Sequence, residues 1–323
     1  MRMKRRQWML GAVLAAALAG QGQAWAETWP ARPVRLVVPQ AGGSGNDVLA
    51  RALAEQLGQR WGQAVVVENR PGANGVVAVQ YVKGQPADGY TLFFAGVSNL
   101  AFNPLLYRKL SYDPQRDLAG VAMLANSPFV LVASPRLGVH SFADFLKLAR
   151  AQPGALSYAS GGIGNSTHLA MALVAERTGL RMLHVPFNGG GGSTSLMAGD
   201  TPVMMNVVAG VQPYIAGGKL VPLAVTGAHR LGALPGVPTF GELGYDVAVP
   251  GWYAIVARAG TPAALVERIN ADINAVIGSA AFRDKLANQF LEPIQGPPAL
   301  VFQTMQRDAA AWAPLIRRLD ISL

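Results

Sequence analysis

The side chains that could carry catalysis are few and scattered along the chain. None of the four histidines, His140, His168, His184 and His229, stands at metal-ligand spacing from another histidine or a carboxylate. Ser160 follows Tyr-Ala rather than the Gly-x of a nucleophile elbow, and no obvious base accompanies it. The chain has no cysteine, which excludes thiol catalysis and thiolate metal sites. This pattern favours binding without chemistry, metal or cofactor, with a hydrolase or lyase that uses Ser160 or His168 as the rival hypothesis.

Three stretches combine a buried strand, a glycine-rich loop and the start of a helix: 34–57, 156–176 and 182–198. In the first, Ser44 and Asp47 have the spacing of a capping box, so a helix is expected to begin there. A loop that ends on a helix start presents free N–H groups and the positive end of a dipole. Each stretch therefore has the local chemistry to hold an anion.

These loops do not match the nucleotide-binding signatures. The chain lacks a phosphate-loop GK[ST], and Gly162-x-Gly164-x-x-Thr167 lacks the third glycine of the dinucleotide fingerprint. Any one of the loops could be an ordinary tight turn between a strand and a helix. Together, three loops rich in Ser, Thr and Asn with almost no charge predict a cradle for a small polar anion.

The first 26 residues have the pattern of a secretory signal peptide. Basic residues 2–6 precede an apolar stretch, Trp8–Leu18, and Ala24-Trp25-Ala26 forms a small-x-small cleavage site. We expect export with cleavage after Ala26, by either the general or the twin-arginine route. Cleavage lowers the net charge from +9 to about +5. The remaining basic residues are scattered, which argues against a nucleic-acid partner.

The mature chain alternates strands with helices, which predicts an α/β fold with parallel sheets covered on both faces. The number of units indicates two lobes, which we place at 27–126 with 250–323 and at 127–249. No low-complexity linker separates them, so short crossover strands should join the lobes. Ligands of such sheets lie beyond the carboxyl ends of the strands, which places the expected site in a cleft between the lobes.

Ordered motifs through nearly all the mature chain resemble those of the Bug-type extracytoplasmic solute receptors, the substrate-binding components of tripartite tricarboxylate transporters. The motifs that carry the resemblance are Trp29-Pro30-x-x-Pro33-Val34-Arg35, Gly42–Arg51, Val66–Ala73, Ala87–Leu92, Asn103-Pro104, Tyr112–Pro114, Tyr158-Ala159-Ser160-x-Gly162-x-Gly164, His168-Leu169, His184–Phe187, Ala216–Leu220, Leu223–Thr226, Pro235-x-Val237-Pro238-Thr239 and Ala259–Pro262.

This resemblance implies a two-lobed, type II-like periplasmic binding protein that closes over a small carboxylate, amino acid or similar solute without catalysis. It further implies a monomer that delivers its ligand to membrane transporter subunits, although a sensor that engages a membrane kinase fits the sequence equally well. Backbone N–H groups, small hydroxyls and water would hold the ligand. The residues expected to line the site are Gly42, Gly43, Ser44, Asn46, Asp47, Ser98, Asn99, Ser160, Gly162, Gly164, Ser166, Thr167, His168, Phe187, Asn188, Gly189 and Asn206.

Two regions depart from the pattern of the family that the chain resembles. Acidic residues are common in the strand after the third loop, where this chain has Pro202 and Asn206. We expect their loss to shift preference away from ligands with a cationic group. In the first loop Gln40-Ala41 replaces the usual Phe-Pro, which makes that loop less rigid.

Overall fold

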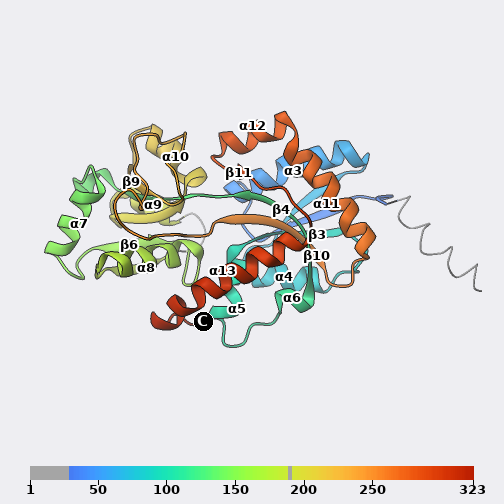
Figure 1. The fold of residues 1–323 in the computed structure, drawn as a ribbon, viewed down its shortest axis with the longest axis horizontal. Helices are drawn as coiled ribbons and strands as arrows, with labels where there is room; N and C mark the ends of the chain where they lie inside the picture. The colour runs from blue at the N-terminus through green and yellow to red at the C-terminus, as the bar shows by residue number, and fades with distance from the viewer. Residues whose placement is uncertain (1–28, 188–190) are drawn as a thin grey trace, which may run out of the picture.

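The computed structural model describes residues 29–187 and 191–323, so the expected leader and the predicted site residues Asn188 and Gly189 lie outside the described part. Figure 1 shows two α/β halves side by side, each built on its own sheet, and we call them the first and second lobes. None of the described helices is long and apolar enough to cross a membrane.

The sheet of the first lobe has six strands. In spatial order they are β11 (Glu292–Pro293), β4 (Leu118–Asn126), β10 (Trp252–Arg258), β3 (Thr91–Gly96), β1 (Val34–Val38) and β2 (Val65–Asn69). Strand β1 is parallel to both β2 and β3, whereas β10 is antiparallel to β3 and β4. The expectation of a purely parallel sheet is therefore wrong here, because β10 returns from the second lobe and enters the sheet in the opposite direction.

The second sheet is mixed for the same reason. Its order is β7 (Leu183–Pro186), β6 (Ser157–Ser160), β8 (Val203–Val207), β5 (Phe129–Ala133) and β9 (Val221–Val225). Strands β6, β7 and β8 are parallel, and β5 is antiparallel to β8 and β9. The strands that lead into the glycine-rich loops, β1, β6 and β7, thus pair in parallel in both lobes.

Helices cover both faces of each sheet (Figure 1). In the first lobe α3 (Gly45–Trp61), α11 (Ala263–Gly278) and α12 (Ala280–Asn288) share one apolar cluster with the sheet, and α4 (Val76–Lys83) and α13 (Ala299–Arg318) belong to another. In the second lobe α7 (Phe142–Ala151) and α8 (Ser166–Thr178) cover one face, and α9 (Gly191–Ala198) and α10 (Val208–Ala216) the other. The remaining short helices are η1 (Ala73–Gly75), η2 (Ser98–Phe102), α5 (Asn103–Leu106), α6 (Pro114–Asp117) and η3 (Pro135–Leu137).

Two crossover segments and α13 join the lobes. The backbone N–H of Ser127 donates to the carbonyl of Gly251 at 2.7 Å, which ties the outgoing segment to the returning one. A Cβ atom on Gly251 would lie 2.1 Å from the Ser127 carbonyl oxygen, so the segments can touch only because this residue is glycine. From α13, Arg318 Nε donates to Glu176 of α8 at 2.6 Å. The chain therefore changes sheet near the expected boundaries, whose exact positions stay a prediction.

Candidate functional site

The first glycine loop, between β1 and α3, is held by a buried carboxylate. Ser44 caps α3 as predicted, since its Oγ accepts the Asp47 N–H. Asp47 Oδ2 accepts the Gly43 N–H at 2.8 Å and Arg51 Nε at 2.9 Å, while its Oδ1 accepts Asn69 Nδ2 at 2.9 Å. These donors, with the Arg51 hydrogen bond the largest influence, lower the pKa of Asp47 to about 2.

Asp47 satisfies only one backbone N–H group of this loop, that of Gly43. The N–H groups of Gly42, Gly45 and Asn46 form no hydrogen bond with any described residue. Gly42 and Gly45 are exposed and Asn46 is half-buried. Because α3 begins at Gly45, these donors lie at the positive end of a helix of 17 residues.

A second loop of the first lobe, outside the predicted site residues, follows β2 at the same edge of the sheet. Its four consecutive residues Gly72, Ala73, Asn74 and Gly75 have φ values of 134°, 44°, 52° and 88°. Ala73 and Asn74 are not glycines, so their positive φ values cost conformational energy, which surrounding contacts must offset. One such contact runs from Asn74 Nδ2 to Asn103 Oδ1, at 2.9 Å.

Ser98 and Asn99, both predicted to contact ligand, have different environments. Asn99 is buried, its Nδ2 donates to the Asn74 carbonyl at 2.9 Å and its Oδ1 accepts the Gly96 N–H at 3.2 Å. Tyr112 donates its hydroxyl to the Asn99 carbonyl at 2.6 Å. The Asn99 amide therefore holds the strained loop in place, whereas the half-buried Ser98 hydroxyl has no partner among the described residues.

The glycine loop of the second lobe leads from β6 into α8. Asn165 caps the helix through the Thr167 N–H at 3.0 Å, and Thr167 Oγ1 accepts the Gly161 N–H at 2.8 Å. Several backbone donors remain without a partner in the described residues, and they are the N–H groups of Ile163, Ser166 and His168. This loop thus repeats the arrangement found at the start of α3.

Three aromatic rings stack beneath this loop. The His168 and His184 centroids lie 3.8 Å apart at an interplanar angle of 7°, and Tyr158 stacks on His184 at 4.9 Å. His168 Nδ1 accepts the Gly164 N–H at 3.1 Å, and His184 Nε2 lies 2.6 Å from Ser160 Oγ. Burial lowers the pKa of both imidazoles, that of His168 to about 4, with the neighbouring His184 contributing.

The Ser160–His184 pair corrects our expectation that the serine has no base. The parallel pairing of β6 and β7 places Tyr158 opposite His184, which brings a residue 24 positions away beside Ser160. The pair nevertheless does not form a catalytic triad, because Ser160 has no exposed surface and His184 contacts no carboxylate among the described residues. The described part of the chain also holds no group of three His, Asp or Glu that could bind a metal.

Comparison with known proteins identifies the kind of molecule. The model of the tripartite tricarboxylate transporter family receptor matches residues 49–321. The chain belongs to this receptor family. It is 33% identical over 302 residues to the protein BugT of Bordetella pertussis, covering 92% of each chain.

Solved structures agree with this family assignment. The R. palustris protein Rpa4515 with adipate is 33% identical with a TM-score of 0.86, covering 90% of this chain and 97% of its own. The periplasmic binding protein BugD is 26% identical with a TM-score of 0.84, covering 91% and 99%. The receptor therefore has the predicted two-lobed α/β fold of periplasmic solute-binding proteins.

Two further predicted residues of the receptor are described by the structure: Phe187 belongs to the third stretch, 182–198, and Asn206 contacts it. Phe187 is half-buried and donates its N–H to the Ser160 carbonyl at 3.0 Å. Asn206 of β8 donates Nδ2 to Ser193 Oγ of α9 at 3.1 Å, and its Oδ1 accepts the Val207 N–H at 2.8 Å. Asn206 thus ties β8 to the starts of α9 and α10.

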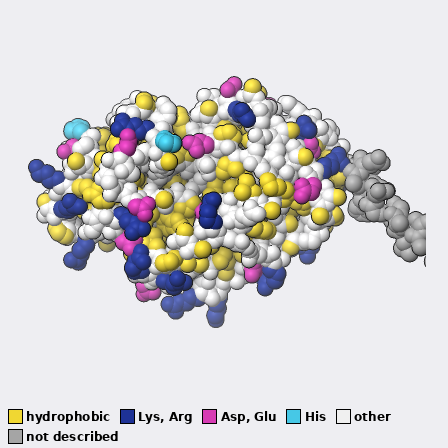
Figure 2. Space-filling view, in the orientation of Figure 1, with side chains coloured by type: hydrophobic (Ala, Val, Ile, Leu, Met, Phe, Trp, Pro, Cys, Tyr) yellow, Lys and Arg dark blue, Asp and Glu magenta, His cyan; other side chains and the backbone are white. Residues whose placement is uncertain are grey.

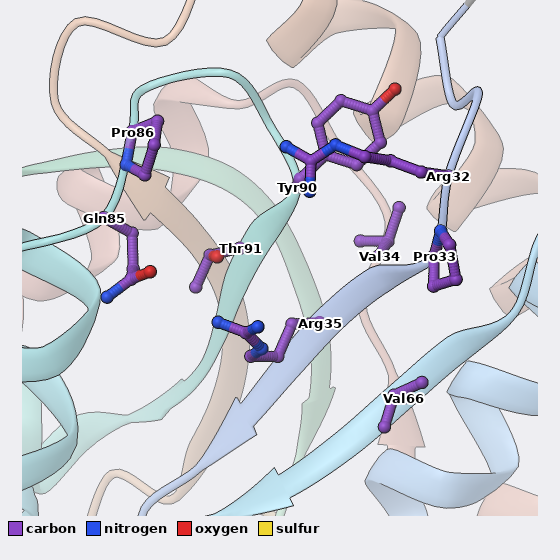
Figure 3. Close-up of a pocket in the computed structure, with 9 residues that line it drawn as sticks. All are labelled: Arg32, Pro33, Val34, Arg35, Val66, Gln85, Pro86, Tyr90 and Thr91. Atoms are coloured by element: carbon purple, nitrogen blue, oxygen red, sulfur yellow. The ribbon is translucent and has the colours of Figure 1, made fainter.

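The receptor has a cavity of about 280 Å³ elsewhere, at the amino-terminal ends of β1 and β3 (Figure 3). Its two arginines are already paired, Arg32 with Asp88 at 2.9 Å and Arg35 with Glu68 at 3.0 Å. This cavity therefore offers an anion little uncompensated charge. Figure 2 likewise shows Lys and Arg side chains dispersed over the visible face without a continuous basic stripe.

Proposed function

We propose that this receptor binds a small dicarboxylate between its lobes and passes it on chemically unchanged. The proposal rests on backbone N–H groups at the starts of α3 and α8 that have no partner in the described part of the chain, those of Gly42, Gly45, Asn46, Ser166 and His168. Fixed N–H dipoles bind carboxylate oxygens without the cost of burying a second charge. The adipate held by the similar protein Rpa4515 supports a ligand with a carboxylate at each end.

We propose further that the ligand carries no amine. The one carboxylate that the first loop contributes is Asp47, whose oxygens are occupied by Gly43, Arg51 and Asn69. Asn206 is a neutral amide in the strand where acidic residues are common in the family, so it supplies no negative charge for a cationic group. An ammonium group would therefore lose its hydration without gaining an anionic partner.

Proline substitution tests the backbone donors one at a time. Gly45 and Ser166 are the first residues of their helices, where proline is tolerated, and the residues before them are extended, with ψ of 161° at Ser44 and 153° at Asn165. Gly45→Pro and Ser166→Pro should each raise the adipate Kd about 10-fold or more, since a hydrogen bond to a charged group contributes about 1.5–3 kcal/mol.

The matched controls keep the N–H group. Gly45→Ala adds a methyl group that meets no heavy atom within 4 Å, and Ser166→Ala removes only the hydroxyl. Both should leave the adipate Kd within a few-fold of the wild-type value in titration calorimetry. Equal effects of proline and alanine at both positions would refute the role of these donors.

Ligand class and fate are tested on the wild-type receptor. We expect glutarate and adipate to bind and glutamate to bind much more weakly, and Asn206→Asp to gain affinity for glutamate alone. Mass spectrometry of the ligand after incubation should recover it intact and stoichiometric. Tight glutamate binding would contradict the amine argument, and an altered product would favour the hydrolase or lyase.

We also propose export with cleavage after Ala26 and a monomeric state, which N-terminal sequencing and light scattering of the exported protein test.

A further inference from the structure

The buried imidazole of His168 has a role that ligand contact does not explain. Its side chain is 7% exposed, and its Nδ1 already accepts the Gly164 N–H. A ring nitrogen that accepts a hydrogen bond from a backbone N–H must be unprotonated, so the neutral ring carries its proton on Nε2. The hydrogen bond therefore exists only while His168 is neutral.

Gly164 is fixed from a second side by the first lobe. A Cβ atom at this position would lie 2.9 Å from Leu106 of α5 and 3.0 Å from Leu323, and the residue has a φ of 73°. The backbone of the second-lobe loop thus packs directly on side chains of the first lobe. Gly164 stands between His168 on one side and the contact between lobes on the other.

We propose that His168 is a positioning residue that sets the Gly161–Asn165 loop through Gly164 and so aligns the free N–H groups at the start of α8. The inference rests on the proposed function, because those N–H groups are the proposed ligand donors. It assigns His168 a side-chain role within the protein, in place of the side-chain ligand contact expected from the sequence.

The surroundings of the ring keep it in the accepting state. His184 of β7 stacks on it at 3.8 Å, and Tyr158 of β6 lies 6.3 Å away, and these are the titratable groups that face it. Burial disfavours the charged form of the ring most strongly, and a second imidazolium so close would add repulsion. The pKa of His168, about 4, leaves the ring neutral at pH 7.

The first measurement uses the ligand-free protein, so it does not depend on the proposed function. Proton–nitrogen correlation spectra at pH 7 should show His168 as the Nε2–H tautomer and a Gly164 amide proton protected from exchange. Both signals should change together as the pH is lowered through the titration of His168. A His168 ring protonated on Nδ1, or a Gly164 amide that ignores this titration, would overturn the proposal.

Variants provide the second measurement, with adipate as the probe. In His168→Asn the amide oxygen can take the place of Nδ1, so we expect a Kd within about 3-fold of wild type and a protected Gly164 amide. His168→Leu fills the space without an acceptor and should raise the Kd at least 10-fold and expose the Gly164 amide. The exposed His229→Asn should change neither. Wild-type affinity in His168→Leu would refute the role.

The two proposals fail in different ways. If wild type binds no dicarboxylate but its spectra show the expected tautomer and linked titration, the loop is positioned by His168 and the proposed ligand class is wrong. If adipate binds and the spectra contradict the tautomer, the proposed function stands and this inference falls. Should His168→Leu not fold, the wild-type spectra and His168→Asn still decide.

Discussion

Replacing Asp47 tests whether a buried carboxylate organises the glycine loop between β1 and α3. In Asp47→Asn the remaining oxygen can still accept hydrogen bonds from Gly43 and Arg51. The new amide nitrogen, however, replaces the Oδ1 that accepts a hydrogen bond from Asn69 Nδ2 at 2.9 Å, so two donors face each other. One buried hydrogen bond is lost and the Gly43 bond loses its charge, which together cost about 2 kcal/mol. Asp47→Ala removes the acceptor of the Gly43 N–H and of one Asn69 N–H, while Asn69 keeps its bond to the Gln40 carbonyl, and it should cost about 3–4 kcal/mol.

The assay is urea unfolding at neutral pH, followed by adipate titration of each variant. Asp144 provides a matched control, because it occupies the corresponding position after Ser141 at the start of α7 but is exposed. Asp144→Asn should destabilise less than Asp47→Asn and leave the adipate Kd unchanged. The reasoning is refuted if Asp47→Asn and Asp144→Asn lose equal stability, or if Asp47→Asn binds adipate with the wild-type Kd.

The pH dependence provides an independent check of the Asp47 prediction. The pKa of Asp47 in the folded protein, about 2, is below its usual value, so the carboxylate stabilises the fold fully above about pH 4. This stabilisation is lost as the pH falls towards 2. Asp47→Asn should lack that component of acid unfolding, and an identical acid profile for wild type and variant would contradict the low pKa.

Three further outcomes are expected from unfolding measurements. Ala73→Gly should stabilise the protein by about 0.5–1 kcal/mol, because glycine adopts a φ of 44° without strain, and a loss of stability would contradict this. Gly251→Ala should destabilise by about 3 kcal/mol or more, since its Cβ would lie 2.1 Å from the Ser127 carbonyl oxygen, whereas Gly236→Ala, with no atom within 4 Å, should be nearly neutral. Because the pKa of His168 in the folded state is depressed to about 4, the unfolded chain takes up the proton first. Stability should therefore fall by up to about 2 kcal/mol between pH 7.5 and 5, and fall less in His168→Asn.

The sequence pattern predicts local structure well where the determinants lie close together. Ser44 caps α3 as expected, because a helix cap needs residues only three positions apart, although the Asp47 carboxylate accepts the Gly43 N–H rather than that of Ser44. The direction of β10 could not be predicted, since periodicity marks a strand without saying which neighbours it pairs with. The mixed character of both sheets follows from the path of the chain between lobes.

The same limit applies to the site. Residue types alone predict that the glycine-rich loops form the site, but partners distant in sequence decide which hydrogen bonds each side chain forms. The Asn99 side chain forms hydrogen bonds with Asn74 and Gly96. The register of β6 and β7 places His184 within hydrogen-bond distance of Ser160. The strained loop at Ala73 could have been suspected from Pro-Gly-Ala-Asn-Gly, a run of turn-forming residues directly after a strand.

The position of β10 has a consequence for the order in which the protein acquires its structure. This strand lies between β3 and β4, yet it is synthesised after the whole second sheet. Until residue 258 has left the ribosome, β4 has neither of its eventual neighbours and β3 has an open edge. The second lobe, continuous from 129 to 225 in its sheet, can form meanwhile. Strands β3 and β4 thus keep unpaired edges until the chain after the second sheet joins the first, so the first lobe can complete its sheet only after the second lobe's strands have been made.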